Sequence, residues 1–223
     1  MLKKIHVKIC CIKNIKEARL AIRYGASAIG LVGKMPSGPG IISDKRIKRI
    51  AEKIPPPIAT FLLTSETSAD KIIAHHKRVN TNTIQIVDEL QDGSYKDIKR
   101  ALPGVKLVQV IHVKNQKSIE KAIGISQNVD ALLLDSGNPN QAIKELGGTG
   151  KIHNWEISKK IVKKVACPVF LAGGLNHVNI KRAIQKVEPF GVDVCSGLRA
   201  DGNLISNKVA RFMEKVRETN ITY

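Results

Sequence analysis

The 223-residue sequence lacks several features that would place it in a simple class of protein. No apolar run approaches the roughly 18–20 residues of a membrane-spanning helix, and residues 1–8 hold no sustained apolar segment like that of a secretory signal. Only 4% of residues are aromatic, but 43% are hydrophobic and 25% charged, which excludes collagen, a coiled coil and a wholly disordered chain. We therefore expect a soluble, cytoplasmic protein with no membrane partner.

Cysteine is also scarce. The chain has four, Cys10, Cys11, Cys167 and Cys195, with no C-x-x-C motif and no spacing typical of a zinc site. We expect them to be reduced in a cytoplasmic chain, and we expect no bound metal. Cys167 and Cys195 lie in apolar, strand-like runs where a cysteine usually acts as a small core residue, whereas Cys10 stands at the end of such a run.

The chain is strongly basic, but its basic residues are not concentrated in one segment. The chain has 37 Lys and Arg against 19 Asp and Glu, a net charge of +18, which alone is typical of many nucleic-acid-binding proteins. However, residues 1–111 hold 20 basic and 9 acidic residues and residues 112–223 hold 17 and 10, with no block of about five like charges. We therefore expect no nucleic-acid partner, and a field that attracts a small anionic substrate.

Short β-branched runs recur along the chain, separated by longer amphipathic stretches. Eight such runs begin near Ile5, Ala28, Pro57, Thr83, Lys106, Val129, Cys167 and Gly191. Helices are expected over about 14–24, 43–53, 67–79, 94–102, 115–127, 155–165, 176–187 and 205–217. The runs are almost continuously apolar, as in strands covered on both faces, and their alternation with helices predicts a parallel sheet.

The spacing of the runs selects one architecture. Eight units in 223 residues average about 28 residues each, which leaves no room for a second domain. The sequence therefore predicts an α/β fold, a TIM (β/α)8 barrel forming a single domain over residues 1–223. The alternative, an open doubly wound sheet, would carry a glycine-rich turn after its first strand, where this chain has Cys10-Cys11-Ile12.

A barrel of this kind has its active site at the carboxyl ends of its strands. Glycines follow the last strands there, and the loop of the sixth unit adds more. Backbone N–H groups at such turns bind phosphate, although glycines also serve simply to make tight turns. We predict a phosphate site formed by Gly148, Gly150, Gly173, Gly174, Ser196 and Gly197.

Two reactive side chains end strands elsewhere around the predicted mouth. Cys10 ends the first strand and Asp135 the sixth, on roughly opposite sides. A thiolate can accept a proton, and a carboxylic acid in an apolar site can donate one. This pair suits aldose–ketose proton transfer with no cofactor. The structural alternatives are a small buried residue for Cys10 and a loop cap for Asp135.

Several stretches together resemble one enzyme family. The phosphoribosylanthranilate isomerases of tryptophan biosynthesis share patterns with residues 7–10, 25–32, 130–136, 147–150, 168–176 and 191–197. The resemblance implies an intramolecular oxidoreductase that rearranges N-(5′-phosphoribosyl)anthranilate to 1-(2-carboxyphenylamino)-1-deoxyribulose 5-phosphate without a cofactor. It makes Asp135 the general acid and Cys10 the general base. Lys8 precedes Cys10 by two residues and therefore lies on the same face of the strand, which makes it a candidate cation beside the thiol.

Three departures from the family pattern affect the anthranilate end. Cys11 stands where the family usually has glycine, and residues 37–40 lack the arginine that holds the substrate carboxylate, leaving Lys34 as the nearby cation. After the fourth strand, Gln85 is kept but the usual histidine is not. Two alternatives remain, an isomerase of another phosphorylated sugar amine and a non-catalytic barrel that binds a phosphorylated ligand. We expect a monomer or a homodimer.

Overall fold

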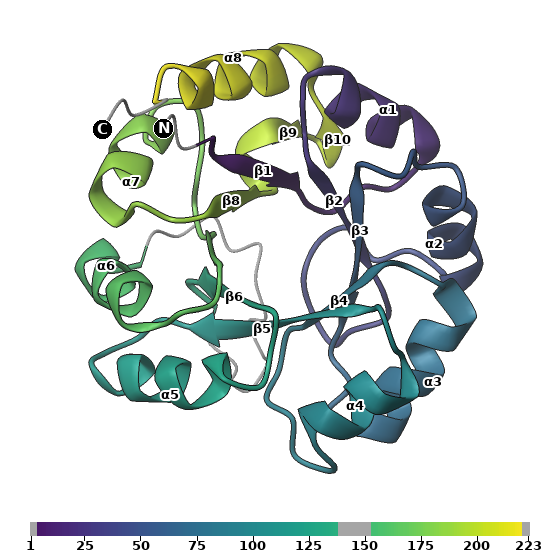
Figure 1. Cartoon of the computed structure of the whole chain (residues 1–223). Helices are drawn as coiled ribbons and strands as arrows, with labels where there is room; N and C mark the ends of the chain where they lie inside the picture. The colour runs from purple at the N-terminus through teal and green to yellow at the C-terminus, as the bar shows by residue number, and fades with distance from the viewer. Residues whose placement is uncertain (1–3, 138–152, 220–223) are drawn as a thin grey trace.

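Eight parallel strands close into a barrel, and eight α-helices surround it (Figure 1). The computed structural model describes residues 4–137 and 153–219. The barrel strands are β1 (His6–Ile9), β2 (Ala28–Val32), β3 (Ala59–Thr64), β4 (Thr83–Ile86), β5 (Lys106–His112), β6 (Ala131–Asp135), β7 (Val169–Leu171) and β8 (Gly191–Val194). Each strand pairs with its neighbour in sequence, and β1 pairs with β8 to complete the barrel. The predicted TIM barrel is confirmed.

The helices also fall close to the predicted ranges. They are α1 (Ile15–Arg23), α2 (Asp44–Ala51), α3 (Ala69–Val79), α4 (Tyr95–Ala101), α5 (Lys117–Ser126), α6 (Trp155–Lys164), α7 (Ile180–Val187) and α8 (Ser206–Arg217). The largest difference is at α7, expected from residue 176. There the Asn176 side chain accepts hydrogen bonds from the N–H groups of Val178 and Asn179, which holds a turn and delays the helix.

A small addition after β8 was not predicted. A 3₁₀ turn, η1 (Ser196–Leu198), leads into a hairpin of β9 (Arg199–Ala200) and β10 (Asn203–Leu204). Asp201 and Gly202 form its turn with positive φ angles of 49° and 72°, as an Asp-Gly hairpin turn requires. The hairpin brings Arg199 back toward the mouth of the barrel.

The core has two parts. One lies between the strands and the helices, and the other fills the barrel interior with residues that include Phe61, Leu133 and Phe170. The interior also holds a charge, because Lys8 is completely buried and its Nζ lies 2.8 Å from Asp193 Oδ2. Burial alone would lower the pKa of Lys8, but the Asp193 carboxylate raises it above its ordinary value, so Lys8 stays charged.

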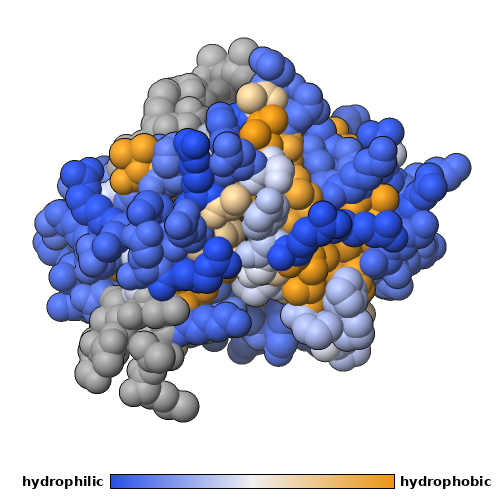
Figure 2. Space-filling view, turned by 90° about the horizontal axis from the view of Figure 1, so that it is seen from above, coloured by the Kyte–Doolittle hydropathy of each residue, from blue (hydrophilic) through white to orange (hydrophobic). Residues whose placement is uncertain are grey.

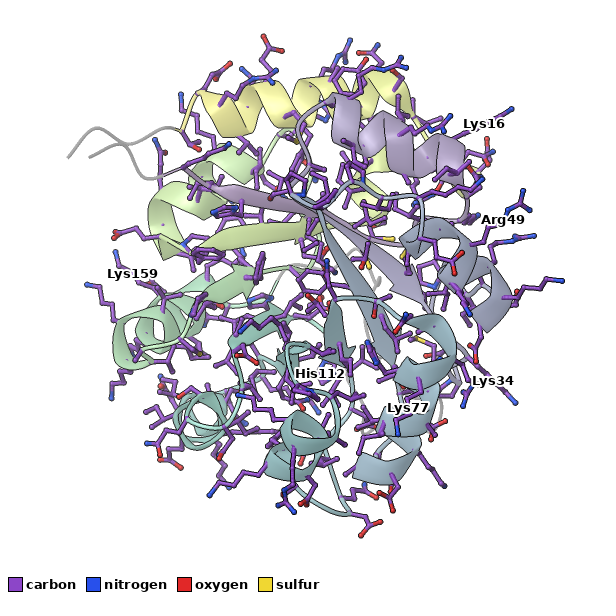
Figure 3. The ribbon with its side chains drawn as sticks, turned by 45° about the vertical axis from the view of Figure 1, so that its right-hand side comes forward. Lys16, Lys34, Arg49, Lys77, His112 and Lys159 are labelled. Atoms are coloured by element: carbon purple, nitrogen blue, oxygen red, sulfur yellow. The ribbon has the colours of Figure 1, made fainter. Side chains whose placement is uncertain are left out.

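Most of the basic residues lie on the outer helices. Hydrophilic side chains cover much of the face in Figure 2, and Figure 3 shows Lys16, Arg49 and Lys159 projecting away from the ribbon. Among the described residues, no helix is both long enough and apolar enough to cross a membrane.

The buried ion pair leads to a prediction about stability. Lys8→Met keeps most of the side-chain volume but leaves the Asp193 carboxylate unpaired in the barrel, so it should lower the free energy of unfolding by about 3–5 kcal/mol. Lys159→Met is the matched control, because Lys159 is partly exposed and 4.0 Å from Glu188, and its effect should stay within about 0.5 kcal/mol. Urea unfolding measures both, and equal effects would contradict the prediction.

Candidate active site

A cavity opens at the carboxyl ends of the strands and brings together most of the predicted site residues. Its lining includes Cys10, Gln85, Asp135, Gly173, Gly174 and Ser196. Around the barrel, β7 and β8 separate the strand of Asp135 from the strand of Cys10. The turn of Gly173 and Gly174 after β7 and the side chain of Ser196 after β8 therefore lie between Asp135 and Cys10 on the cavity wall. Gly148 and Gly150 lie outside the described residues.

Cys10 is fixed at the end of β1 by backbone contacts and by a glycine on the next strand. Its N–H donates to the Val194 carbonyl at 2.9 Å, which extends the pairing with β8. A Cβ at Gly30 would lie 2.7 Å from Cys10 Sγ, so the absence of a side chain on β2 makes room for the thiol. Cys10 is 5% exposed, and its exposure is to the cavity that it lines.

An arginine that sequence reasoning missed holds the turn after β1. Arg199 Nη2 donates to the carbonyl oxygens of Cys10 at 3.2 Å and Cys11 at 2.6 Å, while Nη1 donates to Glu17 Oε1 at 3.1 Å. Burial favours the neutral form of Glu17, but the hydrogen bonds from Arg199 and two backbone N–H groups lower its pKa. Nothing in the sequence pattern relates these residues, because Glu17 and Arg199 are 182 positions apart.

Asp135 ends β6 in a buried environment, with only 8% of its surface exposed. Burial raises the pKa of this carboxyl to about 6, and the nearby Asp193 charge adds to the rise, against the opposing effects of the Ser136 N–H and Lys8. The Ser136 N–H donates to Asp135 Oδ1 at 2.7 Å and fixes its orientation. A carboxyl with this pKa is partly protonated near neutral pH and can donate a proton.

Left-handed backbone shapes the glycine turn after β7. Gly173 and Gly174 have φ angles of 83° and 63°, which favour glycine, and Asn179 holds the turn by donating to the Gly174 carbonyl at 2.9 Å. Among the described residues, no hydrogen bond uses the N–H group of either glycine. Successive free N–H groups in such a turn are suited to an anion.

Gly197, which was predicted to bind phosphate, lies outside the cavity lining. A Cβ at this position would lie 2.1 Å from the Leu175 carbonyl oxygen, so a glycine is needed for the loops after β7 and β8 to pack together. Its neighbour Ser196 lines the cavity and is exposed.

The two lysines proposed as substrate contacts also lie elsewhere. Lys8 is buried in the barrel interior and faces Asp193, which in turn lines the cavity. Lys34 is exposed outside the lining, and Figure 3 places it at the periphery of the molecule. Gln85 is different, since it lines the cavity and its buried Oε1 has no hydrogen-bond partner among the described residues.

Apolar side chains dominate the cavity wall next to the loop after β2. Met35, Pro39, Leu63 and Val87 contribute to it, and no Lys or Arg belongs to the described lining. In residues 4–137 and 153–219, no three His, Cys, Asp or Glu side chains are grouped so as to hold a metal ion.

This combination defines a TIM-barrel enzyme with a thiol, a buried carboxyl and a left-handed glycine turn in one cavity. The family model of N-(5′-phosphoribosyl)anthranilate isomerase matches residues 7–215. The chain is 33% identical to N-(5′-phosphoribosyl)anthranilate isomerase 2 of Methanosarcina mazei, over 96% of this chain and 94% of that one. It is 32% identical to the isomerase of Methanocella arvoryzae, over 96% and 98% of the two chains. The chain belongs to the phosphoribosylanthranilate isomerase family.

The fold is also similar to that of solved isomerase structures. The phosphoribosylanthranilate isomerase of Thermotoga maritima aligns with a TM-score of 0.79 at 26% identity, covering 96% of this chain and 99% of that one. A further isomerase structure, in complex with reduced 1-(o-carboxyphenylamino)-1-deoxyribulose 5-phosphate, has a TM-score of 0.76 at 23% identity and covers the same shares. At that identity the second comparison supports the fold alone.

The raised pKa of Asp135 predicts a pH-dependent cost to stability. The folded state holds the Asp135 proton more tightly than the unfolded chain. The stabilisation that this proton gives the folded state is therefore complete below about pH 4 and is lost as the pH rises through about 6. Asp135→Asn removes the titration and keeps an acceptor for Ser136. Its free energy of unfolding relative to the wild type should therefore rise by on the order of 2–3 kcal/mol between pH 4 and pH 7.

Urea unfolding of both proteins at pH 4, 5, 6 and 7 measures this difference. Other titrating groups are common to the two proteins and cancel to first order. A difference that stays constant across this range would show that Asp135 titrates normally in the folded state.

Proposed function

We propose that the chain catalyses the Amadori rearrangement of N-(5′-phosphoribosyl)anthranilate to 1-(2-carboxyphenylamino)-1-deoxyribulose 5-phosphate. The observation that carries the proposal is the shared cavity of Cys10 and Asp135, with the turn of Gly173 and Gly174 between them. Membership of the isomerase family supports the same reaction. In this proposal the substrate phosphate binds at the turn of Gly173 and Gly174. The ribose then lies between Asp135, the acid, and Cys10, the base.

Asp135 is the general acid in the first step. Its carboxyl donates a proton to the ribose ring oxygen as the bond from that oxygen to C1′ breaks, and the nitrogen lone pair forms the C1′=N bond of a Schiff base. The buried environment raises the pKa of Asp135 to about 6, so a fraction of the carboxyl is protonated near neutral pH and can donate this proton. The N–H of Ser136 keeps one carboxyl oxygen engaged, so the other is the oxygen that faces the substrate.

Cys10 is the general base in the second step. Its thiolate removes the proton from C2′, and the released electron pair forms the C1′=C2′ bond of an enolamine while the Schiff base is neutralised. Tautomerisation to the ketone completes the reaction, with a proton returned to C1′. The role of Arg199 is to position the base, because it binds the carbonyl oxygens of Cys10 and Cys11 rather than the substrate.

The anthranilate end of the substrate finds fewer matching groups in this cavity than the phosphate and the ribose do. Met35, Leu63 and Val87 offer apolar contacts to an aromatic ring, but the described lining has no cation for its carboxylate. This observation favours a second candidate, an isomerase for a phosphorylated sugar amine that carries no acidic group. Rescue of a tryptophan auxotroph that lacks the isomerase tests the choice, because only the first candidate restores growth.

The assigned roles predict the kinetics of two variants. Cys10→Ala and Asp135→Asn should each lower kcat by roughly 10²–10⁴-fold, the usual contribution of a positioned acid or base, while binding of a phosphorylated product analogue changes little. Cys167→Ala is the control, since Cys167 is free and lies outside the cavity lining. Turnover of Asp135→Asn at the wild-type rate would remove Asp135 from the mechanism.

Gln85 leads to a separate prediction about binding. Its unpartnered Oε1 can accept a hydrogen bond from the substrate amine or a hydroxyl group. Loss of one such bond costs about 0.5–1.5 kcal/mol, so Gln85→Leu should raise KM about twofold to twelvefold with a smaller change in kcat. Lys34→Ala is the comparison variant, because Lys34 is exposed and lies outside the cavity lining. A larger rise in KM for Lys34→Ala than for Gln85→Leu would contradict this placement of the substrate.

A further inference from the structure

Two cysteines without a role in the proposed reaction meet in the cavity wall. Cys11 follows β1 and Cys195 follows β8, 184 positions apart in the sequence, and their Sγ atoms lie 2.6 Å from each other. Both residues carry free thiols and both line the same cavity as Cys10. Small molecules that enter the cavity therefore reach the pair.

The backbone at Cys11 makes the presence of a side chain there unusual. Its φ angle is 61°, in the left-handed region where a residue with a Cβ is strained and glycine is not. The side chain is also closely enclosed, since a Cβ at Gly40 would lie 2.5 Å from Cys11 Cβ. The turn thus holds the Cys11 thiol in one place, directed at Cys195.

We propose that Cys11 and Cys195 are a thiol–disulfide modification site that a peroxide oxidises. The Cys195 thiolate attacks one peroxide oxygen, the O–O bond breaks, and a sulfenic acid forms with release of water. The Cys11 sulfur then attacks the Cys195 sulfur, the S–O bond breaks, and a second water leaves. Two thiols are oxidised to one disulfide, and one hydrogen peroxide is reduced to two waters.

The surroundings of Cys195 and Cys11 give their sulfur atoms different roles in the oxidation. Hydrogen bonding with Cys11 and the nearby Arg199 guanidinium lower the pKa of Cys195, against the effect of burial. Hydrogen bonding with Cys10 and Cys195, together with burial, raises the pKa of Cys11. Cys195 is therefore the thiolate that meets the oxidant, and Cys11 is the thiol that resolves the sulfenic acid.

The disulfide would join the turn after β1, which carries Cys10, to the segment after β8, which carries Ser196. The modification thus lies on the wall of the proposed active site, but its chemistry does not depend on the isomerase reaction. It departs from the expectation that all four cysteines serve as inert reduced thiols or as the catalytic base.

Peptide mapping of the full-length protein tests the proposal. The reduced protein is treated with hydrogen peroxide, remaining thiols are alkylated, and the digest is mapped without reduction. We expect two fewer alkylated thiols than in the untreated protein, a cross-linked peptide pair that contains Cys195, and full reversal by dithiothreitol. Cys195 oxidised to sulfinic acid without a cross-link, or no loss of thiols, would overturn the proposal.

Variants identify the partner of Cys195, because Cys10 and Cys11 are adjacent and fall in one tryptic peptide. Cys11→Gly suits the local φ angle, so it should fold and should lose the cross-link. Cys10→Ser and the remote control Cys167→Ser should keep it. A cross-link that survives in Cys11→Gly and is lost in Cys10→Ser would assign the bond to Cys10 and refute the pair proposed here.

Discussion

The pairing of β1 with β8 is the contact on which the rest of the site depends. It runs in register from His6 opposite Gly191 to Ile9 opposite Val194, and it continues through the hydrogen bond from Cys10 to Val194. Every other neighbouring pair of barrel strands is consecutive in the sequence, but this one brings together opposite ends of the chain. Without it, the thiol of Cys10 would have no fixed position relative to the turns after β7 and β8.

Two buried ion pairs reinforce that junction at different depths. Lys8 and Asp193 are direct register partners inside the barrel. The ion pair of Arg199 and Glu17 lies nearer the mouth, beside the turn after β1. Buried pairs of this kind add little net stability compared with apolar packing, yet removal of one partner is costly. Their effect is thus to specify a single arrangement of the junction, which a proton-transfer site requires more than it requires added stability.

The sequence was sufficient to predict the barrel, because apolar runs and amphipathic stretches are properties of neighbouring residues. Ends of elements were less certain, as at α7, where the Asn176 turn replaces the first helical residues. The candidate site was partly predictable for the same reason. Cys10, Gln85 and Asp135 end strands or lie near their ends, so the barrel topology alone brings them to one cavity.

Contacts between distant segments account for what the sequence did not reveal. The role of Arg199 depends on a hairpin that returns it to the turn after β1, and the Cys11–Cys195 contact depends on barrel closure. Lys8 shows the limit most directly. Strand alternation correctly put it on the same face as Cys10, but only the register of β1 against β8 shows that Asp193 takes up its charge.

The charge of the chain and the charge of the cavity have opposite signs, and this difference bears on catalysis. The net charge of +18 is spread over outer helices, whereas the described cavity lining carries Asp135 and Asp193 and no Lys or Arg. In the proposed reaction the outer field attracts an anionic substrate over a distance, and the backbone N–H groups of the glycine turn after β7 hold its phosphate at close range. A lysine in the lining would bind phosphate more strongly, but it would also favour ionised Asp135. With no cation in the described lining to add to the effect of Lys8, the Asp135 carboxyl keeps its raised pKa of about 6 and stays partly protonated near neutral pH.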